Sequence, residues 1–256
     1  MKHSPKSVET LSPTPFETAW IERATRATLA QARPPTKMTA SQWANAFLQL
    51  SEEDSSETGQ YRSDRTPYHV GILDALSDPT RDGADLMAGA QIGKTLIGKA
   101  LVGYHIDHDP CPILMVQPTV EIGDVYSTDR LAPMIRDTPR LRAKVSDPKS
   151  RNSRNTVKKE TFPGGYIASA GANSAASRGS RPVRLVIFDE VDKFPASVKK
   201  EGDPVYLGKV RTKTFHNRKS LLMSTPTDLS TSRINAAWLA SDMRRYYVPC
   251  PHCDGM

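Results

Sequence analysis

Short apolar runs recur along the second half of the chain, and each ends in polar or small residues. Helical patterns of apolar positions separate several of these runs. Short buried runs joined by crossover segments predict a mainly parallel sheet with both faces covered by helices, which is an α/β fold. The expected strands are Asp85–Ala88, Ile113–Val116, Tyr166–Ser169, Arg184–Phe188 and Ser220–Ser224. In such sheets ligands bind beyond the carboxyl ends of the strands, so functional residues should follow these runs.

The first third of the chain follows a different pattern. Residues 1–15 are polar and rich in proline, and Phe16–Ala32 has helical apolar spacing, so residues 1–38 are predicted to be a flexible, partly helical arm. Thr39 or Ser41 would cap a second helix that carries Trp43, Phe47 and Leu50. The acidic, serine-rich stretch Ser51–Gly59 is expected to be an exposed loop.

A phosphate-binding loop is expected after the first of these strands. "MAGAQIGKT" fits the pattern G-x-x-x-x-G-K-[ST], except that alanine replaces the first glycine. Alanine is acceptable there if its φ is negative. The backbone N–H groups of such a loop cradle phosphates, the lysine reaches the β- and γ-phosphates, and the hydroxyl binds Mg²⁺. The predicted nucleotide-binding residues are Ala88, Gly89, Ala90, Gln91, Ile92, Gly93, Lys94 and Thr95.

Two other strand ends carry candidate chemistry. "RPVRLVIFDEVDKFP" places Asp189 and Glu190 directly after an apolar strand, where Asp189 would hold Mg²⁺ and Glu190 would polarise the attacking water. This pair is typical of ATP-hydrolysing P-loop enzymes of the ASCE type. "KSLLMSTPT" ends another strand in hydroxyl residues. Ser224 and Thr225 there would bond Glu190 or the γ-phosphate, although an ordinary strand-to-turn transition explains the pattern equally well.

Composition adds charge to this picture. The net charge is +7, and residues 129–160 hold ten lysines and arginines against four acids. Such a run is usually a solvated surface, but in a nucleic-acid motor it would contact phosphates. Three cysteines indicate a reduced compartment rather than a disulfide scaffold, and no apolar run approaches the roughly 18–20 residues of a membrane span. Cys111 is expected in the core.

These segments together resemble the large terminase subunit of double-stranded DNA phages, of the lambda-like GpA type. The resemblance runs in order over roughly residues 40–253 and rests on "RTPYHVGILDAL", "MAGAQIGKT", "ILMVQPT", "SAASRGSRPVRLVIFDEVDKFP", "EGDPV", "MSTPT" and "SRINAAWLASDMRRYYVPCPHC". It implies an ATP-driven motor that pumps viral DNA into a capsid in the host cytoplasm. The implied partners are double-stranded DNA, a terminase small subunit, the capsid portal and further copies of the chain, with no membrane.

The resemblance also assigns roles to residues. Lys94 and Thr95 would bind phosphate and Mg²⁺, Asp189 the metal ion, and Glu190 would activate water, while Ser224 and Thr225 resemble the coupling motif. The basic segment then gains a reason to exist, with Arg151, Arg154, Lys158 and Lys159 as DNA contacts. Some packaging motors carry an arginine inside the phosphate loop. This loop has Ala90 and Gln91 there, so Arg178 or Arg181 would supply that charge.

The chain ends in "CPHCDGM", in which Cys250 and Cys253 form half of a zinc ribbon. Zn²⁺ is therefore a possible ligand of an incomplete site. The predicted organisation is the arm over 1–38, the ATPase domain over 39–245 and the start of a truncated knuckle over 246–256. The nuclease half of the family is expected to be absent. The alternatives are a non-catalytic prophage remnant that binds DNA or partner proteins, and a two-lobed helicase, which the length disfavours.

Overall fold

The computed structural model describes residues 14, 18–25, 37–145, 156, 159–174, 181–198, 202–248, 250 and 252–253. The chain divides into two units, residues 1–37 and residues 38–256. In the first unit, residues 18–25 are helical and the side chains of Trp20 and Ile21 are exposed. No helix in the described part of the chain is long and apolar enough to cross a membrane.

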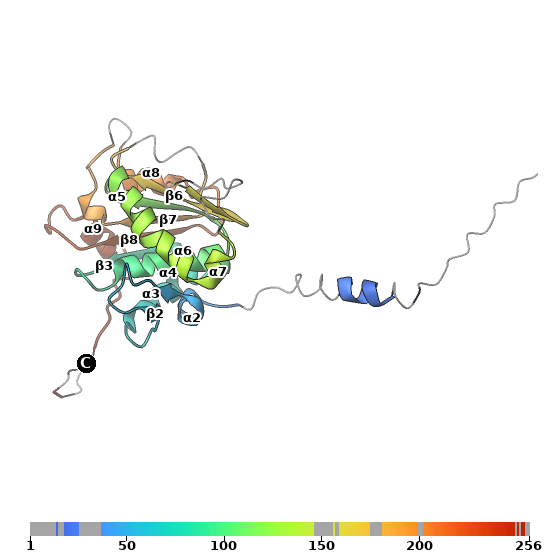
Figure 1. Cartoon of the computed structure of the whole chain (residues 1–256). Helices are drawn as coiled ribbons and strands as arrows, with labels where there is room; N and C mark the ends of the chain where they lie inside the picture. The colour runs from blue at the N-terminus through green and yellow to red at the C-terminus, as the bar shows by residue number, and fades with distance from the viewer. Residues whose placement is uncertain are drawn as a thin grey trace, which may run out of the picture. The chain divides into compact units, whose positions relative to one another are not determined.

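The second unit is built on a six-stranded sheet in the order β3-β8-β7-β4-β6-β5 (Figure 1). The first five strands of this order run parallel, and they confirm the α/β prediction and all five expected strands. β5, which pairs antiparallel with β6, is a strand that the apolar pattern did not predict. The strands are β3 (Gly83–Met87), β4 (Pro112–Gln117), β5 (Lys159–Phe162), β6 (Gly165–Gly171), β7 (Leu185–Asp189) and β8 (Lys219–Ser224).

Helices cover both faces of the sheet because successive strand residues point to opposite sides. Met115, Ile187 and Met223 belong to the core on one face, and Val116, Phe188 and Leu222 belong to the core on the other. The first face is covered by α2 (Ala40–Phe47), α3 (Tyr68–Ser77), α4 (Lys94–Asp107), α5 (Val120–Tyr126), η1 (Ser127–Leu131), α6 (Ala132–Asp137) and α7 (Pro139–Arg142). The second face is covered by η3 (Val191–Lys193), α8 (Pro204–Val210) and α9 (Arg233–Leu239).

The helix expected after Thr39 exists but is shorter than predicted. Thr39 caps α2 in a capping box with Gln42, and Trp43 is fully buried. The helix ends at Phe47, so the placement of Leu50 on it was wrong. Leu50 belongs instead to β1 (Gln49–Leu50), which pairs with β2 (Gly59–Gln60). This pairing, which joins residues about ten positions apart, satisfies backbone groups that a longer helix would have used.

The acidic stretch after β1 is not the wholly exposed loop that its composition suggested. The side chain of Asp54 is only 3 % exposed and forms ion pairs with Lys99 of α4 and Arg130 of η1. Lys99 is itself buried. A buried carboxylate and a buried ammonium are stable only when they are paired, so this contact fixes the loop against the helix that follows the phosphate loop.

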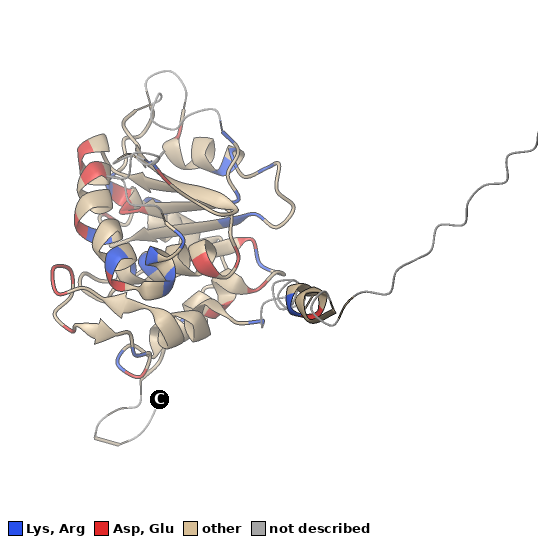
Figure 2. Cartoon of the chain, turned by 45° about the vertical axis from the view of Figure 1, so that its right-hand side comes forward, with Lys and Arg blue, Asp and Glu red and all other residues tan. Residues whose placement is uncertain are grey.

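The basic segment is partly neutralised by the fold. Arg130 pairs with Asp54, Arg136 with Glu53 and Asp137, and both Arg140 and Lys144 with Asp107. Figure 2 shows basic and acidic residues interspersed over these helices and loops. Four of the ten cations counted in the sequence therefore serve intramolecular pairs.

Gly103 lies where α4 crosses the indole of Trp43. A Cβ added at Gly103 would lie 2.4 Å from Cη2 of Trp43, whereas a Cβ at Gly71 of α3 would meet nothing within 4 Å. Trp43 cannot move easily, because it is buried and its Nε1 donates to Asp107 at 2.8 Å. This contact requires the absence of a side chain at Gly103.

Gly103→Ala is therefore expected to destabilise the protein by about 1–3 kcal/mol through overpacking. Gly71→Ala is the matched control, and it should raise stability by up to about 1 kcal/mol because alanine is the better helix former. Urea denaturation of both variants measures the difference. Equal effects of the two substitutions would show that Trp43 does not constrain α4.

A small cavity of about 10 Å³ lies between α5, η1 and the β5–β6 hairpin. Three of its lining oxygens, Tyr126 Oη, Glu160 Oε2 and Ser169 Oγ, are buried and have no hydrogen-bond partner among the described residues. Burial raises the pKa of Glu160 from 4.5 to about 7. The neutral acid is therefore the form that the folded protein favours at this position.

The stability that this raised pKa confers should be present below pH 4.5 and should be lost as the pH rises through about 7. The loss would amount to about 3 kcal/mol at most. Glu160→Gln keeps the shape without the charge, so it should stabilise the protein at pH 8 and change little at pH 4. Thermal melts of both proteins between pH 4 and pH 8 measure this. A constant difference across that range would contradict the burial of an ionisable Glu160.

Candidate active site

The carboxyl ends of four parallel strands meet at one edge of the sheet. The phosphate loop follows β3, Gln117 ends β4, Asp189 ends β7, and Ser224 ends β8. Met87 is paired with Ser224, and Asp189 is paired with Met223, so these ends are in register. The fold thus brings together side chains that lie up to about 130 positions apart, as between Lys94 and Thr225.

The phosphate loop has the backbone that its sequence predicts. Gly93 adopts φ 81°, and a Cβ there would lie 2.8 Å from the ring of His69, so glycine is required. Gln91 has φ 60°, whereas Ala88 is not among the described residues with positive φ. Alanine is therefore compatible with the position of the missing first glycine. Its N–H donates to the carbonyl of Ser224 at 3.2 Å, which ties the start of the loop to β8.

α3 holds the loop from behind. The hydroxyl of Tyr68 and Nε2 of His69 both lie within hydrogen-bond distance of the carbonyl of Ile92, at 3.2 and 3.1 Å. Burial lowers the pKa of His69, so its ring is neutral near pH 7, and Nε2 must carry the proton to donate to a carbonyl. Both contacts leave the N–H groups of the loop free to face a ligand.

Lys94 occupies the centre of the site. Its side chain is 7 % exposed, and Nζ donates to the carbonyl of Gly89 at 2.8 Å and to Oγ1 of Thr225 at 2.7 Å. Oε1 of Glu190 lies 3.8 Å away. The ammonium is therefore neutralised by groups of the protein itself.

Asp189 presents a buried carboxylate oxygen that is available to a ligand. Gln117 Nε2 donates to its Oδ2 at 3.2 Å, and Oδ1 has no hydrogen-bond partner among the described residues. Burial raises the pKa of Asp189, opposed by the bond from Gln117, while the neighbouring Glu190 raises it further. Thr95 begins the first turn of α4, next to Lys94. An orphaned carboxylate oxygen together with a hydroxyl fits the hard oxygen ligands that Mg²⁺ prefers.

Glu190 leaves the strand through a strained turn. Its φ of 57° and ψ of 51° are left-handed, a conformation that costs roughly 1–2 kcal/mol for a residue with a side chain. The turn sets its carboxylate between Lys94, at 3.8 Å, and Lys193, at 3.4 Å. Strain of this kind persists where the surrounding structure over-determines a conformation, and it is frequent at functional sites.

The remaining predicted residues are not brought to this centre. Arg178, Arg151, Arg154 and Lys158 lie outside the described residues. Arg181 precedes β7 and acts electrostatically on Tyr166, which is paired with Pro112 at the start of β4. It therefore lies at the opposite, amino edge of the sheet from Lys94. Lys159 of β5 places Nζ 4.7 Å from the centre of the Tyr166 ring.

The cysteines also lie apart from the site. Cys111 is buried in the core, as predicted. Cys250 is half-buried and Cys253 is exposed. Among the described residues, no group of three or more histidine, cysteine, aspartate and glutamate side chains is arranged to hold a metal ion.

Sequence reasoning gave no role to several residues that shape the site. Gln117 holds Asp189, Tyr68 and His69 hold Ile92, and Asp192 contacts the segment after β8. The signal for Gln117 was available, because a polar residue directly ends the apolar run "ILMV". The others depend on contacts between segments that are distant in the sequence.

Comparisons with known proteins agree with this site. Residues 55–256 match the family described as "Phage terminase large subunit gpA, ATPase domain". The large terminase subunit of Enterobacteria phage P21 is 31 % identical over 222 residues, which cover 86 % of this chain and 34 % of that protein. That of Escherichia phage lambda is 28 % identical over 232 residues, which cover 89 % and 36 %. The chain thus spans about a third of the length of these relatives.

Solved structures share the fold. The large terminase of bacteriophage HK97 superposes with a TM-score of 0.62 at 16 % identity, covering 79 % of this chain and 41 % of that one. The large terminase of a thermophilic bacteriophage gives 0.50 at 18 % identity, covering 71 % and 43 %. With the family match over residues 55–256, these findings show that the chain belongs to the gpA family of phage terminase large subunits and carries its ATPase domain.

Proposed function

We propose that this chain binds and hydrolyses ATP with Mg²⁺ and is the motor domain that drives phage DNA into a capsid. The observation that supports this best is the convergence of Lys94, Glu190 and Thr225 beside the unpartnered Oδ1 of Asp189. A non-catalytic remnant that only binds DNA or proteins would have no use for a buried lysine and a strained glutamate at one strand edge.

The residues divide the work by their chemistry. Backbone N–H groups of residues 88–93 and the ammonium of Lys94 would bind the phosphates, and the hydroxyl of Thr95 and Oδ1 of Asp189 would hold the metal ion. Mg²⁺ would neutralise charge on the phosphate oxygens. Glu190 would orient the attacking water and accept its proton. Gln117 would keep the carboxylate of Asp189 in place.

Thr225 would report the state of the site. In this structure its hydroxyl accepts from Lys94 at 2.7 Å. A phosphate is a stronger acceptor than a hydroxyl, so ATP would draw the ammonium away and free Thr225. We propose Ser224 and Thr225 as the coupling motif on this basis, with Lys94 rather than Glu190 as the group that Thr225 contacts before ATP binds.

A charge-stabilising arginine would come from a second copy of the chain. Arg181 is exposed at the amino edge of its own sheet, so in this proposal it serves the phosphates bound by a neighbouring subunit. Arg178 lies three positions earlier and is the other candidate. A working homo-oligomer in the host cytoplasm, together with a terminase small subunit and a capsid portal, follows from this proposal.

Duplex DNA would contact the basic segment through Arg151, Arg154, Lys158 and Lys159. These residues belong to the part of the segment that follows the four cations already paired with acids. We assign no nuclease reaction to the described residues. Asp189 and Glu190 are committed to the nucleotide site, and Asp54 is committed to Lys99 and Arg130.

Lys94→Ala should abolish ATP hydrolysis and weaken ATP binding, because the ammonium offsets phosphate charge in both the ground state and the transition state. Phosphate release and calorimetric binding measure the two effects, with duplex DNA present and absent. Lys209→Ala, which removes a lysine of α8, is the control. Unchanged turnover of the Lys94 variant would refute the assignment of this loop.

Glu190→Gln and Asp189→Asn should separate catalysis from metal binding. The glutamine variant should bind ATP normally but hydrolyse it about 10²–10⁴-fold more slowly, since an amide cannot accept the proton from water. The asparagine variant should lose the Mg²⁺-dependent part of ATP binding. If both variants lost binding to the same degree, this division of roles would be wrong.

Neutralising Arg151, Arg154, Lys158 and Lys159 together should weaken binding to duplex DNA of any sequence. The slope of log affinity against log salt should fall by up to about 0.9 for each phosphate that the variant no longer neutralises. The control neutralises Arg62, Arg65, Arg136 and Arg218, which pair with acids in the structure. Equal slopes in the two variants would exclude this segment as the DNA contact.

A further inference from the structure

Asp192 lies in the turn that carries Glu190, and it is the centre of a hydrogen-bond cluster. Its Oδ2 accepts from the N–H of Thr227 at 3.0 Å and from the hydroxyl of Thr227 at 3.2 Å. Its Oδ1 accepts from the N–H of Ile234 at 2.9 Å. Its own N–H donates to Oγ of the fully buried Ser224 at 3.2 Å. Asp192 therefore joins η3, the segment after β8 and the start of α9.

These bonds close a ring of contacts around the proposed nucleotide site. Lys94 contacts Thr225 at 2.7 Å and Glu190 at 3.8 Å. Thr225 is two positions from Thr227, and Glu190 is two positions from Asp192. The bonds between Thr227 and Asp192 complete the ring on the side away from Lys94. If ATP draws Lys94 away, these bonds and the one from Asp192 to Ser224 still hold the two strand ends in register.

α9 holds the same turn from its other side. Arg233 donates to the carbonyls of Phe194 and Pro195 at 2.9 and 2.8 Å. The turn that presents Glu190 is therefore fixed at both ends by the segment that runs from β8 to α9. A shift of that segment would move the carboxylate of Glu190.

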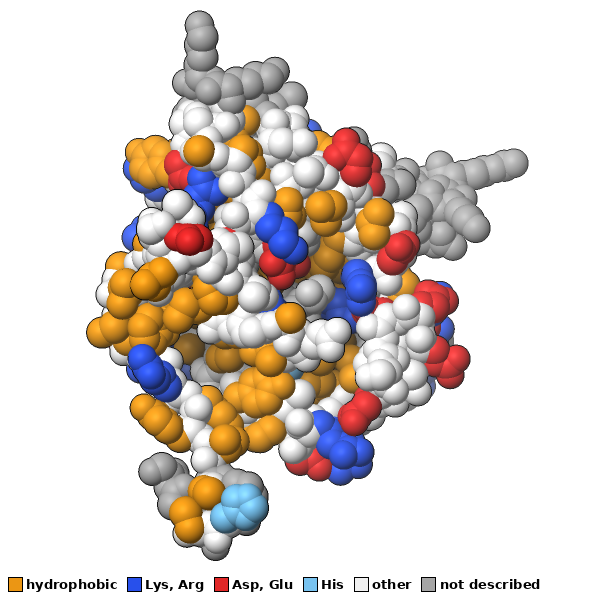
Figure 3. Space-filling model, turned by 90° about the vertical axis from the view of Figure 1, so that its left-hand side faces the viewer, with side chains coloured by type: hydrophobic (Ala, Val, Ile, Leu, Met, Phe, Trp, Pro, Cys, Tyr) orange, Lys and Arg blue, Asp and Glu red, His pale blue; other side chains and the backbone are white. Residues whose placement is uncertain are grey.

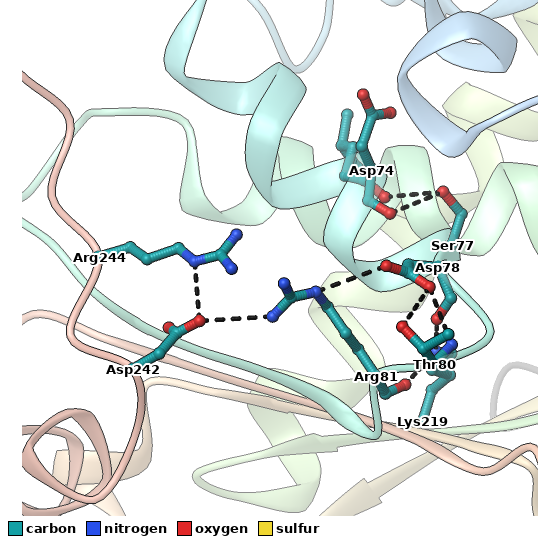
Figure 4. A network of polar contacts seen from close by, with 9 residues as sticks. Asp74, Ser77, Asp78, Thr80, Arg81, Lys219, Asp242 and Arg244 are labelled. Atoms are coloured by element: carbon teal, nitrogen blue, oxygen red, sulfur yellow. Dashed lines mark hydrogen bonds and ion pairs between the residues drawn. The ribbon is translucent and has the colours of Figure 1, made fainter.

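The chain beyond α9 returns to the phosphate loop. Arg81, which follows α3, forms ion pairs with Asp78 and with Asp242, and Asp242 also pairs with Arg244 (Figure 4). The ring of Tyr246 lies 5.8 Å from that of Tyr68, whose hydroxyl contacts Ile92. Figure 3 shows hydrophobic side chains gathered on the face that carries α9. The segment held by Asp192 thus also reaches the back of the phosphate loop.

We propose that Asp192 is a positioning residue that fixes the carboxylate of Glu190 relative to Ser224 and Thr225, and that it acts through Thr227. The inference rests on the proposed ATPase function and adds the residue that keeps its two strand ends in register. Both carboxylate oxygens accept from backbone N–H groups. An asparagine side chain has one oxygen only, so Asp192→Asn must give up either Thr227 or Ile234.

The test compares Asp192→Asn, Thr227→Val and Thr227→Ser with the unmodified 256-residue chain. Single-turnover hydrolysis and ATP affinity are measured separately, with duplex DNA present. The matched control is Asp228→Asn, because Asp228 accepts from Ser230 N–H at 2.9 Å in the neighbouring turn and makes no bond to η3. Thermal melts of the proteins alone report the structural cost of each change.

Asp192→Asn should leave ATP affinity within about twofold while slowing hydrolysis by about ten- to a hundredfold, since misplacement by about 1 Å can cost about 10²-fold. Thr227→Val should slow hydrolysis in the same way, and Thr227→Ser, which keeps the hydroxyl, should restore it. The Asp192→Asn/Thr227→Val double variant should be no slower than Asp192→Asn alone, because the two residues share one interaction.

Other outcomes overturn the proposal in distinguishable ways. Hydrolysis by Asp192→Asn at the rate of Asp228→Asn, or equal rates of the two Thr227 variants, would refute the positioning role alone. A loss of ATP affinity in proportion to rate would mean that Asp192 only supports the fold. An unmodified chain that neither binds nor hydrolyses ATP would refute the proposed function, and this inference with it. If Asp192→Asn fails to fold, the two Thr227 variants decide.

Discussion

The ammonium of Lys94 is the constraint on which the site depends. A charge that is only 7 % exposed must be compensated, and the compensating groups come from three separate strand ends. The carbonyl of Gly89 follows β3, Glu190 follows β7, and Thr225 follows β8. The parallel register of the sheet brings these ends together. The same groups that stabilise the lysine in this structure are those that the proposed reaction requires it to leave.

The core of the fold could be predicted from the sequence because its signals are local. Each parallel strand is a short apolar run, and the phosphate loop and the Asp189–Glu190 pair each lie within a few residues. β5 was missed because Lys159–Phe162 alternates polar and apolar residues and pairs antiparallel with its neighbour in sequence. Its assignment as a strand depends on the partner strand rather than on its own hydrophobicity.

The electrostatic part of the structure could not be predicted in the same way. Composition marked the stretch around Asp54 as exposed, but one of its carboxylates is buried against Lys99, 45 positions away. Composition also counted Arg140 and Lys144 as part of a basic surface, whereas both pair with Asp107. Charge runs describe a surface only after the fold has used the charges it needs. The bonds of Asp192 to Thr227 are hidden from the sequence for the same reason.

The central claim is that Lys94 exchanges protein partners for phosphate when ATP binds. A crystal structure of the chain with Mg²⁺ and a non-hydrolysable ATP analogue tests this most directly. The account predicts that Nζ of Lys94 leaves Oγ1 of Thr225 and contacts the terminal phosphates, with a metal ion beside Oδ1 of Asp189. A bound nucleotide with Lys94 still on Thr225, or a nucleotide bound elsewhere on the surface, would contradict it.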